Sequence, residues 1–109
     1  MKFLVGYKVD GGEFITIVEV SEDEANLREI ESKVCDKMRN WDIEVKNWVP
    51  VKKRLFEKDK QYLIKFQYDH ITDIQMEIVY AKNMIDAMEI FESVCKRPDR
   101  YFIKSVERV

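Results

Sequence analysis

One stretch of this sequence occurs twice, sixty residues apart. Val18–Val49 aligns without a gap on Ile78–Val109, with six identities in 32 pairs, where unrelated sequences would share roughly two. The identical pairs are Glu29/Glu89, Ile30/Ile90, Val34/Val94, Cys35/Cys95, Ile43/Ile103 and Val49/Val109. Trp41 also falls on Tyr101, and Val18 on Ile78. Such a repeat restricts the chain to folds that are built from two similar units.

The first copy begins with a predicted β-hairpin. Apolar side chains alternate with other residues over Phe3–Val9, which is the period of a strand with one buried face. Asp10-Gly11-Gly12 follows, and glycine supplies the positive φ that a tight hairpin turn needs. Phe14–Val20 has apolar residues on both faces, which predicts a second strand in the interior of a sheet.

A helix over Glu22–Arg39 is predicted next. Ser21 and Glu24 have the spacing of a capping box, in which each residue pairs with a free backbone N–H at the start of the helix. Apolar residues recur at helical spacing after it, namely Leu27, Ile30, Val34, Cys35 and Met38. Alternation from Trp41 to Val45 predicts a third strand, and Pro50 limits that strand to an edge, a bulge or a kink.

The second copy has the same order of elements. Alternating patterns predict strands over Tyr62–Tyr68 and Ile74–Tyr80, and Asn83 is the expected N-cap of a second helix. That helix has a wide apolar stripe, formed by Met84, Ala87, Met88, Ile90, Phe91, Val94 and Cys95. A last strand is expected from Tyr101 to Val106.

These elements predict an α+β fold with an internally duplicated β-β-α-β unit. We expect two helices on a mainly antiparallel sheet, in a single domain over 1–109. The two pseudo-symmetric repeats would occupy 1–49 and 61–109, joined by a basic junction over 50–60.

Composition limits the possible functions. The net charge of −2 excludes a generally basic nucleic-acid coat, and 46% hydrophobic residues favour a folded chain over a disordered one. Phe3-Leu4-Val5 is too short for a signal peptide or a membrane span. We therefore expect a cytoplasmic protein that does not bind membranes, in which Cys35 and Cys95 are reduced.

The sequence offers no convincing catalytic or metal-binding motif. His70 is the single histidine and lies between Asp69 and Asp73, but neither a second histidine nor a cysteine pair accompanies it. An exposed turn histidine is therefore the favoured interpretation. We expect no enzyme, no cofactor, no metal site and no small-molecule ligand.

The best candidate for a partner-binding site is the basic junction. Residues 50–60 carry five basic and two acidic side chains, whereas 1–49 carry seven and eleven, and 61–109 carry seven and eight. Cationic and aromatic side chains occur close together here, and the candidate site residues are Trp48, Lys52, Lys53, Arg54 and Phe56. Such a group suits an acidic protein partner or a nucleic-acid strand.

Two functions remain open from the sequence. The first is a small cytosolic interaction or regulatory protein that acts through a surface, with phages and mobile elements as one source of such proteins. The alternative is a nucleic-acid-binding accessory protein that uses the basic residues over 52–60. Phosphate contacts weaken steeply with salt, so a salt series separates the two.

Overall fold

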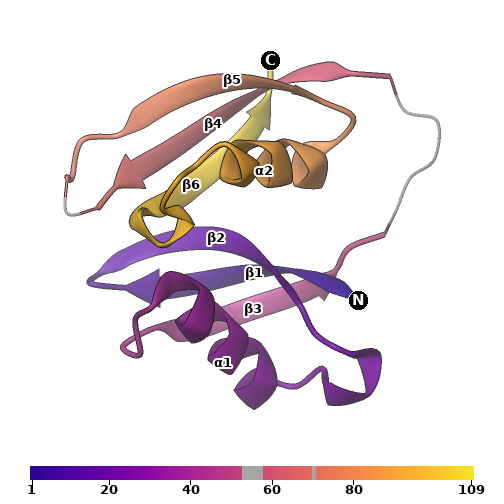
Figure 1. Cartoon of the computed structure of the whole chain (residues 1–109), viewed down its shortest axis with the longest axis vertical. Coiled ribbons are helices and arrows are strands. Elements are labelled where there is room, and N and C mark those ends of the chain that lie inside the picture. Colours follow the sequence, from indigo (N-terminus) through magenta and orange to yellow (C-terminus); the bar gives the residue numbers. More distant parts are fainter. Residues whose placement is uncertain (53–57, 70) are drawn as a thin grey trace. The chain divides into compact units, whose positions relative to one another are not determined.

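The computed structural model describes residues 1–52, 58–69 and 71–109, and it divides into two compact units, Met1–Val51 and Lys52–Val109. In each unit one helix packs on antiparallel strands (Figure 1). The predicted α+β class is therefore confirmed.

The first unit contains three strands in the order β3-β1-β2. Its elements are β1 (Lys2–Val9), β2 (Gly12–Glu19), the 3-10 turn η1 (Glu22–Glu24), α1 (Leu27–Met38) and β3 (Glu44–Pro50). The hairpin turn forms as predicted, because Asp10 and Gly11 both adopt positive φ, at 50° and 79°. The two outer strands each pair with β1 in antiparallel fashion.

The predicted start of the first helix is wrong. Residues Glu22–Glu24 form a 3-10 turn, and the side chain of Ser21 makes no capping hydrogen bond. The N-cap is Asn26, whose Oδ1 accepts a 3.0 Å hydrogen bond from the backbone N–H of Glu29. The helix ends at Met38, because Arg39 adopts a left-handed φ of 52°.

The core of the first unit lies between α1 and one face of its sheet. Ile30 and Val34 have no exposed surface, and Cys35 and Met38 are also buried. The sheet contributes buried side chains from alternate positions of β1, namely Phe3, Val5, Tyr7 and Val9. Leu27 is half exposed, so the helix stripe begins one turn later than the sequence predicts.

The second unit repeats this order of elements, with its strands arranged β6-β4-β5. Its elements are β4 (Lys60–Tyr68), β5 (Gln75–Ala81), α2 (Met84–Ser93), the 3-10 turn η2 (Pro98–Arg100) and β6 (Tyr101–Arg108). Asn83 is the N-cap of α2 as predicted, and its Oδ1 accepts a 2.8 Å hydrogen bond from the N–H of Asp86. Phe91 is buried against Phe66, with ring centroids 4.8 Å apart.

The wide apolar stripe predicted for α2 is only partly correct. Ala87, Met88 and Phe91 are buried, but Ile90 is 37% exposed and Val94 is 71% exposed. The helix ends at Ser93, so Val94 is its C-cap and not a core position.

The sixty-residue register of the repeat is not confirmed. In the two hairpins, Phe3 lies opposite Val18 while Tyr62 lies opposite Val79, one residue beyond the Ile78 that the alignment pairs with Val18. Trp41 is 73% exposed. Its aligned partner Tyr101 instead packs against aromatic rings, those of Phe66, Tyr68 and Phe91.

What the two units share is their topology. In both, the first strand is central, the second is its hairpin partner and the third follows the helix. Each central strand also carries a register shift against its third strand, at Gly6/Tyr7 and at Lys65/Phe66. The helix N-caps Asn26 and Asn83 are 57 residues apart. The topology is therefore similar in both units, although the helices and strands are not all spaced by sixty residues.

Candidate interaction surface

The structure describes only part of the predicted basic site. Trp48 lies on β3 opposite Val5 and is half-buried, and Lys52 is exposed just after that strand. Lys53, Arg54 and Phe56 lie outside the described residues. The geometry of the predicted group at the junction therefore stays a prediction.

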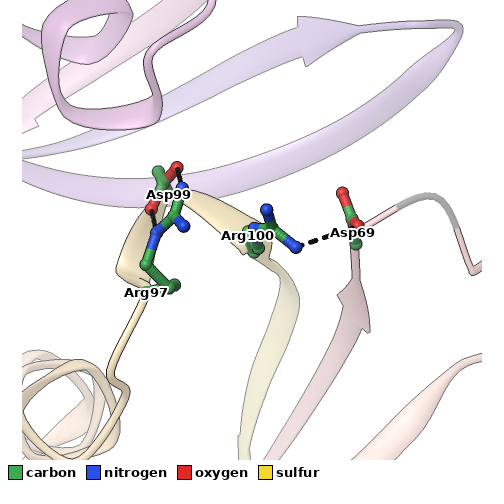
Figure 2. Close-up of polar contacts among 4 residues, drawn as sticks. All are labelled: Asp69, Arg97, Asp99 and Arg100. Atoms are coloured by element: carbon green, nitrogen blue, oxygen red, sulfur yellow. Dashed lines mark hydrogen bonds and ion pairs between the residues drawn. The ribbon is translucent and has the colours of Figure 1, made fainter.

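His70 also lies outside the described residues. Its sequence neighbour Asp69 and three residues just before β6, Arg97, Asp99 and Arg100, form polar contacts with one another (Figure 2). The Asp69 carboxylate forms an ion pair with the Arg100 guanidinium, 3.5 Å between oxygen and nitrogen. The backbone N–H of Asp69 donates a 2.7 Å hydrogen bond to the Arg100 carbonyl. Arg97 binds both carboxylate oxygens of Asp99, at 3.1 and 3.0 Å. These contacts fix the start of β6 beside the end of β4.

Over 1–52, 58–69 and 71–109, no three His, Cys, Asp or Glu side chains are grouped to hold a metal ion.

Neither cysteine has the environment of an activated nucleophile. Both thiols are free; Cys35 is buried, and Cys95 is half-buried, with its Sγ donating to the Phe91 carbonyl at 3.1 Å. Burial raises the pKa of both thiols, and nearby carboxylates raise it further, with Glu31 the main one for Cys35 and Glu92 for Cys95. A thiolate, the reactive form, is therefore scarce at neutral pH in either position.

The most unusual surface of the described residues is on β5. Met76 is 63% exposed, Ile78 52% and Tyr80 64%, and the three share one face of the strand because their positions alternate. We call these three residues the β5 apolar row. Leu63, half-buried on β4, lies directly opposite Ile78 and continues the apolar surface across the strand pair. Exposed apolar side chains in one contiguous group mark an interaction site more often than scattered ones do.

This surface was not predicted from the sequence, because β5 pairs with β4 one residue away from the register that the sixty-residue repeat implies. Val79 lies opposite the buried Tyr62, so Val79 and Ala81 face α2 and are buried. A shift of one residue moves every side chain of a strand to the other face, which places the β5 apolar row outside. Gln75 and Glu77 share the face of Val79 and Ala81, and since polar residues are costly in a core, the sequence favours the opposite orientation of the strand; in the structure both polar residues stay exposed near one end of that face.

Two hydrogen bonds beside the β4–β6 pair show which residues of β4 direct their backbone groups to β6, and therefore which ones face β5. The N–H of Val109 donates to the Gln61 carbonyl at 3.0 Å, and the N–H of Asp69 donates to the Arg100 carbonyl at 2.7 Å. Odd-numbered residues of β4 therefore direct their backbone groups to β6, and even-numbered residues such as Tyr62 direct theirs to β5.

The partners of these even-numbered residues are Gln75, Glu77 and Val79. Since backbone direction alternates along a strand, the intervening residues of β5 present their N–H and C=O groups to its other edge. These intervening residues are Met76, Ile78 and Tyr80. Within the described residues no strand lies on that side of β5. The β5 apolar row thus coincides with an open row of backbone donors and acceptors.

In the first unit, the outer strand β3 is protected in ways that β5 is not. The N–H of Val45 donates to Glu31 Oε2 at 3.2 Å, β3 ends in Pro50, and the register shifts at Gly6/Tyr7. Lys46 adds a charge in the middle of the strand. Proline, lysine, bulges and side-chain covers are the usual means by which edge strands avoid pairing with other chains. β5 contains no lysine or proline and pairs with β4 in continuous register.

Comparisons with protein-family models, with curated proteins and with solved structures find no match to this chain. Among the helices of the described residues, none is both long and apolar enough to cross a lipid bilayer. The chemistry of the β5 surface is therefore the basis on which a function can be argued.

Proposed function

We propose that this protein is a small cytosolic interaction or regulatory module that works by adding an extended segment of a protein partner to the open edge of β5. Addition of a strand to a sheet edge is an established mode of peptide recognition, in which backbone hydrogen bonds supply affinity and alternate side chains supply specificity. The observation that carries the proposal is the coincidence of the exposed Met76, Ile78 and Tyr80 with an open edge that has no lysine, proline or bulge.

The surface also indicates which segment would fit. A partner strand would place apolar side chains at alternate positions, beside Met76, Ile78 and Tyr80 on the outer face. On the inner face it would meet Glu77, so an acidic residue at that position would be disfavoured by like-charge repulsion. The preferred ligand is therefore an extended peptide with alternating apolar residues and a neutral or basic residue opposite Glu77.

Selection from a random peptide library tests this proposal, with two variants as comparison. Ile78→Lys introduces a protective charge at the centre of the β5 edge. Val49→Lys is the matched control, because Val49 is 54% exposed and Ile78 is 52% exposed, and both lie on outer strands.

The selected peptides should show alternating apolar residues and should bind the wild type and Val49→Lys equally. Ile78→Lys should bind them at least tenfold more weakly, which is the loss expected at the centre of an interface. Equal binding to all three proteins would show that β5 is not the working surface.

A further inference from the structure

We infer that β5 can pair with β5 of a second copy of this chain, antiparallel and about a two-fold axis at Ile78. This inference rests on the proposed function, since it names one partner for the same edge. An isologous interface needs a surface that is complementary to itself. The sequence of β5 and its open backbone groups meet that condition in one register.

In this register the backbone groups match completely. Ile78 lies opposite Ile78 of the partner subunit, and Met76 lies opposite the partner's Tyr80. All three residues of the β5 apolar row point their N–H and C=O groups to the open edge, so each would form a doubly hydrogen-bonded pair. Both rows then lie side by side on the same face and form one continuous apolar strip.

Charge excludes the neighbouring register on one side. A two-fold axis at Glu77 would put its carboxylate opposite Glu77 of the partner subunit, and directly opposed like charges destabilise a strand pair. With the axis at Ile78, Glu77 instead lies opposite the partner's Val79. The carboxylate, which is exposed in the single chain, then has an apolar neighbour across the interface and no like charge directly opposite it.

Hydrogen bonding disfavours the register on the other side. With the axis at Val79, the residue opposite Met76 would be the partner's Lys82, which lies beyond the end of β5. The N–H of Lys82 already donates to Asp86 Oδ2 at 3.0 Å within its own chain. One pair at each end of the interface would therefore be lost, leaving the register at Ile78 as the most favourable of the three.

Side-chain geometry adds to the match. Gln61 Nε2 donates a 2.8 Å hydrogen bond to the phenol oxygen of Tyr80, which holds the ring on the outer face with its oxygen directed toward β4. The partner's Met76 would lie next to this ring, and thioether–aromatic contacts are favourable. The same contact would occur at both ends of the two-fold interface.

Light scattering during size-exclusion chromatography tests the association. The wild-type mass should rise from 13.1 kDa towards twice that value as concentration increases from low micromolar to near millimolar. Val49→Lys should behave like the wild type, whereas Ile78→Lys should stay at the mass of one chain. A wild type that is monomeric throughout, or an Ile78→Lys variant that still dimerises equally, would overturn the inference.

Single cysteine substitutions test the register. In a doubly hydrogen-bonded pair the Cα atoms are about 5.5 Å apart, which a disulfide can span. Under mild oxidation Ile78→Cys should therefore form a linked dimer, and a mixture of Met76→Cys with Tyr80→Cys should do the same. Met76→Cys alone should not, because the two copies of residue 76 would have Cα atoms about 14 Å apart. The wild type, which retains Cys35 and Cys95, gives the background. Equal linkage of Met76→Cys and Ile78→Cys would contradict the register.

The two proposals can fail separately. A monomeric wild type that still binds selected peptides through Ile78 would overturn self-pairing and leave strand addition supported. A monomeric wild type whose peptide binding does not depend on Ile78 would overturn both.

Discussion

Tyr80 accepts a 2.8 Å hydrogen bond from Gln61, its cross-strand neighbour on β4, although its side chain is 64% exposed. A long exposed side chain normally samples several rotamers, and fixing one on binding costs roughly 0.5–1.5 kcal/mol. The hydrogen bond to Gln61 removes part of that cost before a partner arrives. The β5 surface is thus partly organised in the free protein.

The two valines at equivalent positions of the sequence repeat should respond differently to truncation. Val34 has no exposed surface, so Val34→Ala should lower the free energy of unfolding by roughly 1–3 kcal/mol through lost burial and a partial cavity. Val94 is 71% exposed, so Val94→Ala should change it by no more than about 0.5 kcal/mol. Urea unfolding of both variants measures this difference. Equal losses would mean that the end of α2 is packed differently.

The positions of the helix N-caps lead to a second prediction. Asn26→Ala and Asn83→Ala each remove a side-chain acceptor from a backbone N–H, which should cost about 1 kcal/mol. Ser21→Ala should cost clearly less, because Ser21 makes no capping hydrogen bond. Chemical denaturation of the three variants provides the comparison. A loss at Ser21 as large as that at Asn26 would restore the capping box predicted from the sequence.

Stability should fall in alkaline solution, in part because of Cys35. Burial, followed by the charge of Glu31, raises the pKa of this thiol above its ordinary value of 9.0. The folded state then holds the proton more tightly than the unfolded state, so the free energy of unfolding decreases as the pH rises past about 9. Cys35→Ala should lose part of this decrease when urea unfolding at pH 7 is compared with about pH 10. An unchanged pH dependence in the variant would refute the assignment.

The basic junction remains a separate prediction. Replacing Lys52, Lys53 and Arg54 by glutamate should barely affect stability, because we expect from the sequence that these charges lie on the surface, where they contribute little. If the junction docks a partner, the triple variant should associate more slowly with it. Binding measured across a salt series shows whether the partner is a nucleic acid or a protein, because nucleic acid gives a steep linear fall of log affinity with log salt. If every measurable interaction survives the triple reversal unchanged, the junction serves only as a connection.

The sequence predicts the elements of this fold better than it predicts their faces. Period-2 patterns and Gly11 locate the first hairpin, because strand alternation and positive φ are local properties. The predicted helix start at Ser21 is wrong, because Ser21 precedes a 3-10 turn and Asn26, five residues later, is the residue that caps the helix.

The β5 surface could not be predicted for a different reason. Alternation shows that Met76, Ile78 and Tyr80 share a face, but both faces of β5 contain apolar residues. Only the pairing of Tyr62 with Val79 decides which face the helix covers. That pairing is a long-range property of the two strands, and no local pattern in the sequence determines its register.

Amide hydrogen exchange tests strand addition at β5 most directly. In the free protein the N–H groups of Met76, Ile78 and Tyr80 should exchange fast, while those of Glu77 and Val79, which face β4, should be protected. With a selected peptide bound, or at a concentration where the chain has dimerised, the three fast amides should become protected and the amides of β3 should be unchanged. Protection that appears on β3 or α1 while Ile78 continues to exchange fast would contradict the account.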